Sequence, residues 1–137
     1  QDRVFGMLSF VERNAVTKRI MSDIQGRMLE DIVLLETKLA YPHCDVFKLV
    51  FATGEFDMVI ADPEAASCQI FEIKHSAEIA PSQYRHLLDA DKCQATEFRF
   101  GAITGKYVLY RGPACAIEGV HYLNVEEYLL NLSNKES

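Results

Sequence analysis

Two neighbouring stretches of this chain carry charged side chains within otherwise apolar, strand-like sequence. Glu55 and Asp57 alternate with apolar residues in the first stretch, and Glu72 and Lys74 flank an isoleucine in the second. Successive side chains of a strand point to opposite faces, so Glu55 should share a face with Asp57, and Glu72 with Lys74. Burying such groups is costly unless they are paired or hold a metal ion. The spacing therefore indicates a site with three carboxylates and one ammonium group.

These side chains have the chemistry of a divalent metal site. Magnesium and manganese prefer hard oxygen ligands, usually one or two carboxylates together with water and a phosphate oxygen. We expect Asp57 and Glu72 to bind Mg²⁺ or Mn²⁺, together with the main-chain carbonyl of Ile73. Such an ion would polarise a phosphodiester and lower the pKa of a bound water. Lys74 would hold that water or offset the charge of the transition state.

Simpler interpretations of the same residues stay open. Glu72 and Lys74 could form only a structural ion pair on an exposed sheet face, because a Glu-x-Lys pattern is common in strands. Glu30 lies near the edge of an apolar helix stripe and could approach the site from that helix. It could equally be a solvated carboxylate, or a partner of Arg27 one turn earlier.

The elements that would position these residues follow from hydrophobic periodicity. Apolar residues at spacings of three and four predict helical structure from Val4 to about Tyr41, ending before Pro42. Strands are predicted at 45–51, 55–61, 68–75, 106–111 and 120–124. Helices are predicted at 82–89, after Pro81, and at 125–132, with a short strand or loop at 97–102.

This order predicts an α/β (α+β) fold with a mixed central sheet flanked by helices. Three strands in succession with short links form an antiparallel meander, and a strand that returns after a helix makes the sheet mixed. At 137 residues we expect a single domain, with a helical N-terminal extension over 1–22 and a core over 23–132. Because the chain opens with Gln1 rather than Met, we also expect it to be part of a longer protein.

Composition narrows the class of protein. The net charge of −6 argues against a protein that coats nucleic acid through bulk electrostatics, although it leaves room for a local basic groove. No apolar run approaches the roughly 20 residues that cross a bilayer, so we expect no membrane partner and a cytoplasmic location. Four cysteines without a Cys-x-x-Cys pair favour free thiols over a structural zinc site.

The charged residues also resemble a known family. In this order, Glu30, Asp57 and the run Glu72-Ile73-Lys74 are similar to the PD-(D/E)XK nuclease superfamily. A closer resemblance is to the nuclease-like domain of unknown function at the C-terminus of many prokaryotic AAA+ ATPases. In that family a Gly-Arg-x-x-Glu helix precedes a Glu-x-Asp strand and a Glu-x-Lys strand. Here these motifs are Gly26–Glu30, Glu55–Asp57 and Glu72–Lys74, within a resemblance that covers roughly 20–132.

The resemblance implies a restriction-endonuclease-like core in the order helix-strand-strand-strand-helix-strand, with the metal site where the strands bend apart. It implies Lys74 and Glu30 as catalytic residues and Asp57 and Glu72 as metal ligands. Glu55 would be an accessory residue, as would Gln83 and Tyr84 from the next helix. One departure is Met58, which stands where a Phe after the Asp is more usual in the ATPase-linked family.

Two functions follow from these residues as expectations. The first is a divalent-metal-dependent phosphodiesterase that acts on DNA. The second is a non-catalytic DNA-sensing or protein-docking module attached to an AAA+ ATPase. The chain has no Gly-x-x-x-x-Gly-Lys-[Ser/Thr] phosphate loop, so we expect no nucleotide site in this segment and an ATPase domain N-terminal to it in the longer protein.

Overall fold

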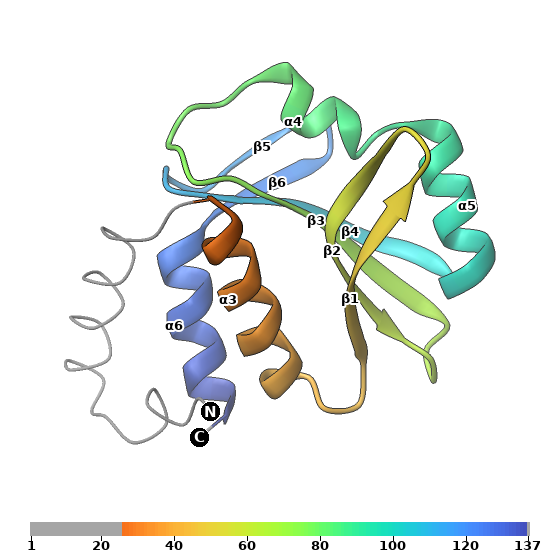
Figure 1. Cartoon of the computed structure of the whole chain (residues 1–137), viewed down its shortest axis with the longest axis horizontal. Coiled ribbons are helices and arrows are strands. Elements are labelled where there is room, and N and C mark those ends of the chain that lie inside the picture. Colours follow the sequence, from red (N-terminus) through yellow and green to blue (C-terminus); the bar gives the residue numbers. More distant parts are fainter. Residues whose placement is uncertain (1–25, 137) are drawn as a thin grey trace.

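A computed structural model describes residues 26–136, which form a six-stranded mixed sheet with helices on both faces (Figure 1). The strands lie in the order β1-β2-β3-β4-β6-β5. They are β1 (Asp45–Phe51), β2 (Gly54–Asp62), β3 (Ser67–Ile73), β4 (Ala102–Tyr110), β5 (Cys115–Ile117) and β6 (Val120–Asn124). The helices are α3 (Gly26–Ala40), α4 (Pro81–His86), α5 (Ala90–Phe100) and α6 (Val125–Glu136).

The predicted fold class is confirmed. β1, β2 and β3 form an antiparallel meander, and β4 returns after two helices to pair parallel to β3. β6 is parallel to β4, and β5 closes the far edge antiparallel to β6. The sheet is therefore mixed, as the order of elements predicted. The helical extension expected over 1–22 lies outside the described residues.

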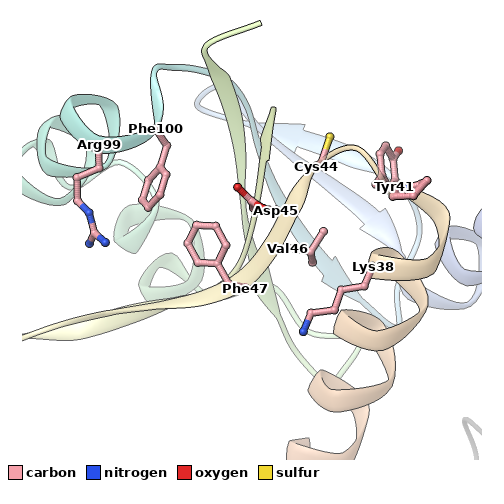
Figure 2. Close-up of a pocket in the computed structure, with 9 residues that line it drawn as sticks. Lys38, Tyr41, Cys44, Asp45, Val46, Phe47, Arg99 and Phe100 are labelled. Atoms are coloured by element: carbon pink, nitrogen blue, oxygen red, sulfur yellow. The ribbon is translucent and has the colours of Figure 1, made fainter. Parts of the chain in front are cut away.

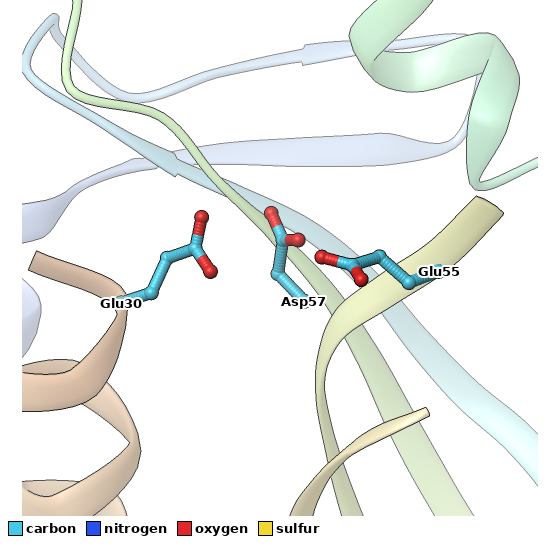
Figure 3. Close-up of side chains that lie close together, drawn as sticks. All are labelled: Glu30, Glu55 and Asp57. Atoms are coloured by element: carbon cyan, nitrogen blue, oxygen red, sulfur yellow. The ribbon is translucent and has the colours of Figure 1, made fainter. Parts of the chain in front are cut away.

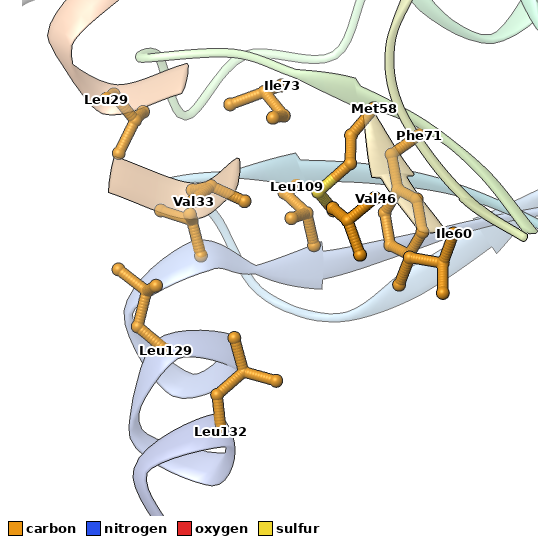
Figure 4. Close-up of a cluster of buried hydrophobic side chains, with 11 residues drawn as sticks. Leu29, Val33, Val46, Met58, Ile60, Phe71, Ile73, Leu109, Leu129 and Leu132 are labelled. Atoms are coloured by element: carbon orange, nitrogen blue, oxygen red, sulfur yellow. The ribbon is translucent and has the colours of Figure 1, made fainter. Parts of the chain in front are cut away.

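Each face of the sheet has its own apolar core. On one face, side chains of α3 and α6 pack on the sheet around Met58, Phe71 and Leu109 (Figure 4). On the other face, residues of α4 and α5 cover a second cluster that includes Phe56, Val59 and other buried strand residues. The sheet is thus buried on both sides, which explains why β2 and β3 contain runs of consecutive buried residues.

The region after β3 differs from the prediction. The helix predicted at 82–89 corresponds to α4, which ends earlier, at His86, and it is followed by a second helix, α5 (Ala90–Phe100), that was not predicted. The short strand or loop predicted at 97–102 is wrong: charged residues alternate there with Phe98 and Phe100 as in a strand, but Phe98 is exposed on a helix. The Asp89 side chain caps α5 by accepting from the main-chain N–H of Lys92. β5, only three residues long, was not predicted.

One irregularity of the sheet matters for the site. Phe47 pairs with Val59, and Leu49 pairs with Phe56. One residue of β1, Lys48, therefore lies opposite two residues of β2, which is the arrangement of a β-bulge.

The bulge changes which face of the sheet the side chains of β2 reach. Met58 packs in the core under α3 and α6, whereas Phe56, two residues earlier, packs in the opposite core. In a regular strand these two side chains would share a face. The extra residue between them, Asp57, is thereby turned to the same side as Met58, toward α3.

Candidate functional site

The β2–β3 ladder ends beside Asp57. The pairing runs from Asp62↔Ser67 to Met58↔Phe71, and β3 then continues along β4 alone, with the Lys74 N–H donating to the Leu109 carbonyl at 2.8 Å. In the opening between the two strands, the Asp57 side chain accepts a hydrogen bond from the Ile73 N–H at 2.8 Å. A carboxylate thus replaces the main-chain partner that β2 no longer supplies.

Three carboxylates meet at this opening. Ligand oxygens of Glu30 on α3, Glu55 on β2 and Asp57 lie within 4.8 Å of one another, and Figure 3 shows the three side chains pointing toward one another. We call these three residues the acidic cluster. Glu55 and Asp57 share a side as their spacing predicted, and Glu30 reaches them from the packed helix. Glu72 is not part of this set of oxygens.

Asp57 is the buried centre of the acidic cluster, with 6% of its surface exposed. Burial and the negative charge of Glu72 raise the pKa of Asp57 to about 8, and the charge of Glu30 and a hydrogen bond with Glu55 act in the same direction. The hydrogen bond from Ile73 opposes this shift. Near neutral pH, Asp57 therefore holds a proton that a divalent cation would displace.

The raised pKa of Asp57 predicts that the chain loses stability as pH rises. The folded state binds the proton more tightly than the unfolded state, so this contribution is fully present below about pH 4 and is lost as pH rises through about 8. We expect a slope of at most about 1.4 kcal/mol per pH unit in the free energy of unfolding. Urea unfolding with a chelator at pH 5, 6, 7 and 8 measures it. Asp57→Asn should remove this slope, and an equal slope in both proteins would contradict the assignment.

Lys48 neutralises part of the acidic cluster. Its Nζ lies 3.3 Å from a Glu30 oxygen and 3.5 Å from a Glu55 oxygen. Burial lowers the pKa of Lys48, but the hydrogen bonds and charges of Glu30 and Glu55 outweigh it, so the pKa is raised. The pairing of Glu30 with Arg27, one of the interpretations left open, does not occur among the described residues, because Glu30 pairs with Lys48 of β1 instead.

Lys48 was not among the predicted site residues. A signal was present, since Lys48 is the one charged residue inside the apolar run of β1. Its partners could not be named from sequence, because they depend on the bulge and on the placement of α3.

Glu72 and Lys74 form the ion pair that their spacing allows. Lys74 Nζ lies 3.1 Å from a Glu72 oxygen, with the Glu72 side chain 10% exposed and the Lys74 side chain 43% exposed. Lys74 lies just beyond the end of β3, which stops at Ile73 rather than at 75 as predicted. A largely buried carboxylate therefore holds an accessible ammonium group beside the opening that contains Asp57.

Gln83 and Tyr84, the accessory residues predicted from the helix after β3, make their contacts away from the acidic cluster. The buried Gln83 side chain accepts from the Ala80 N–H at 3.1 Å and the Tyr122 hydroxyl at 2.9 Å, and donates to the Glu78 carbonyl at 3.2 Å. Tyr84 packs against the core beneath α4 and α5. These contacts hold the start of α4, and none of them reaches the carboxylates.

An open pocket lies elsewhere, along the outer edge of β1 (Figure 2). It has a volume of about 660 Å³ and lies between Lys38 of α3 and Arg99 of α5. Phe47 and Phe100 pack together in it with ring centroids 5.0 Å apart. It contains no member of the acidic cluster and no second group of titratable side chains able to bind a metal.

No known protein family, curated protein or solved structure matches this chain at a significant level. None of the described helices has the length and apolar character needed to cross a lipid bilayer. The four cysteines are free thiols.

Proposed function

We propose that this chain is a divalent-metal-dependent phosphodiesterase of the PD-(D/E)XK type that acts on DNA. The observation that carries the proposal is the buried Asp57 carboxyl, placed where β2 and β3 separate and surrounded by other carboxylates. Buried carboxylates that repel one another are costly in a protein without a cation to hold. Clusters with perturbed pKa values are also typical of functional sites.

The donor set fits Mg²⁺ or Mn²⁺. Both ions prefer hard carboxylate oxygens, and the acidic cluster offers three within 4.8 Å of one another. Asp57, Glu55 and Glu30 would hold the ion, with Glu72 adding negative charge nearby. When bound, the ion would polarise a phosphodiester and lower the pKa of a bound water.

Lys74 has the second role in the proposal. Glu72 orients its ammonium group at 3.1 Å, while the lysine side chain stays accessible to a substrate. An ammonium group at this place would orient the attacking water or offset the negative charge that develops on the phosphate. The same residues are those that resemble the Glu-x-Lys motif of the superfamily.

Incubation with DNA tests the proposal. Linear, nicked and branched DNA should be cleaved by the purified chain with Mg²⁺ or Mn²⁺, and a chelator should abolish cleavage. Isothermal titration with Mn²⁺ reports binding independently of cleavage. A folded chain that binds no Mn²⁺ at millimolar concentrations would overturn the proposal.

A second candidate function is a non-catalytic DNA-sensing or protein-docking module. The family resemblance implies that such a module is attached to an ATPase domain of the same longer protein. Lys48 favours it, because an internal ammonium group already bridges two carboxylates of the acidic cluster. In such a module Lys48 would take the place of a metal ion, and the cluster would only stabilise the fold.

Lys48→Met separates the two candidates. Without metal, this variant should lose about 1 kcal/mol of stability, because Glu30 and Glu55 lose their counter-charge. If the site binds metal, removal of a competing cation should also strengthen Mn²⁺ binding by roughly tenfold. Thermal melting with and without Mn²⁺ measures both effects. A loss of stability that Mn²⁺ does not restore would favour the non-catalytic module.

A further inference from the structure

Lys92 of α5 is a buried lysine that the proposed chemistry does not use. It is 8% exposed, and its Nζ lies 3.0 Å from His86 Nδ1 and 5.9 Å from the ring centroid of Phe51. Within residues 26–136 no carboxylate forms an ion pair with it. A buried ammonium group without a counter-charge is costly, so its contacts need an explanation.

Its partner, His86, connects Lys92 to β2. His86 Nε2 is hydrogen-bonded to the main-chain carbonyl of Glu55. Because a carbonyl can only accept, Nε2 carries the hydrogen, and Nδ1 of the neutral ring accepts from the Lys92 ammonium group. The hydrogen bonds therefore run from Lys92 through His86 to the backbone of Glu55, a member of the acidic cluster.

The hairpin between β1 and β2 is shaped to admit this pair. Gly54 has φ of 140°, where residues with a side chain are strained. A Cβ added there would lie 3.0 Å from Lys92 Nζ and 3.4 Å from His86 Cε1. The His86 ring also packs edge-on to Phe56, with centroids 5.4 Å apart. The two sequence neighbours of Glu55 thus both adjoin the His86 ring: Gly54 leaves space for it, and Phe56 packs against it.

We propose that Lys92 and His86 are positioning residues that fix the backbone of Glu55 and so direct its carboxylate into the acidic cluster. The inference rests on the proposed metal-dependent function. Glu55 is the cluster member nearest the hairpin turn, and its side chain is more exposed than those of Lys48 and Glu30. A polar residue near a turn needs such support to stay within ligand distance of a metal ion, and hydrogen bonds that orient metal ligands strongly affect metal affinity.

Mn²⁺ titration of the full chain tests the coupling between Lys92 and Glu55. Lys92→Met should weaken Mn²⁺ binding roughly tenfold, and Glu55→Gln by at least as much. The double variant should be no weaker than Glu55→Gln alone, because Lys92 acts through Glu55. Lys38→Met, which removes an equal charge from an exposed site, is the control and should bind like the wild type. An unchanged affinity in Lys92→Met, or a full additional loss in the double variant, would overturn the inference.

A second pair of variants covers the case in which Lys92→Met does not fold. His86→Gln keeps an N–H donor near the Glu55 carbonyl and should bind Mn²⁺ within about twofold of wild type, whereas His86→Leu should lose roughly tenfold. Equal losses in both variants would count against positioning.

A measurement without metal separates this inference from the proposed function. The ¹³C shift of the Glu55 carbonyl should change in Lys92→Met, and an unchanged shift would overturn the positioning role. If the wild-type chain bound no Mn²⁺, the proposed function would fail, while this shift would still decide whether Lys92 acts on Glu55.

Discussion

Asp57→Asn should abolish metal-dependent cleavage while leaving the chain folded and, at alkaline pH, more stable. Asp57 is the buried centre of the acidic cluster, so loss of its charge should reduce the cleavage rate at least about 100-fold. The asparagine oxygen can still accept from the Ile73 N–H, which preserves the contact at the end of the ladder. The variant also removes a buried charge that its neighbours oppose, so stability above about pH 8 should rise.

Cleavage assays, Mn²⁺ titration and thermal melting at pH 6 and pH 9 measure these effects together. Asp45→Asn is a matched control, because Asp45 is an exposed aspartate at the start of the neighbouring strand. It should cleave DNA at the wild-type rate. Cleavage that survives in Asp57→Asn would remove Asp57 from the chemistry. Unfolding of this variant at pH 6, where the wild-type Asp57 is already uncharged, would show that the asparagine side chain does not preserve the local contacts.

Lys74→Met should reduce cleavage about 100-fold and leave Mn²⁺ affinity nearly unchanged. Among the described residues Lys74 forms an ion pair with Glu72 and none with the acidic cluster, so the ligand set stays intact. The largely buried Glu72 carboxylate loses its ion pair, which should cost about 1 kcal/mol of stability. Single-turnover cleavage at saturating Mn²⁺ separates the effect on chemistry from an effect on metal binding.

The double variant Glu72→Gln/Lys74→Met distinguishes a catalytic lysine from a purely structural ion pair. Removal of both charges should restore the stability lost in Lys74→Met, because no unpaired carboxylate remains. Cleavage should stay lost. If stability and cleavage recovered together, the pair would be structural and Lys74 would have no part in the reaction.

Strand alternation and the order of elements were enough to predict the meander, the mixed sheet and the shared side of Glu55 and Asp57. These features depend on local periodicity and on short connections, which a single sequence records well. The end of α3 before Pro42 was also predicted from a local signal, the proline itself.

The remaining features depend on contacts between distant segments. Alternation counted from Met58 would have placed Asp57 on the α5 side, and only the bulge turns it toward Glu30. The two ion pairs of Lys48 join β1 to both β2 and α3, so predicting them requires the placement of all three elements. The helix α5 was missed because its first turn is set by the cap of Asp89 and its apolar residues are few.

The bulge in β2 also means that the candidate site depends on one extra residue in this strand. Without Asp57, Met58 would lie opposite Lys48, and Phe56 would still pair with Leu49 in an unbroken ladder. Every apolar side chain of the hairpin would keep its present face. A single-codon deletion at this position should therefore give a regular hairpin that has lost only its buried acid. The hairpin does not need Asp57 in order to fold, so the central carboxylate of the candidate site corresponds to one additional codon in the gene.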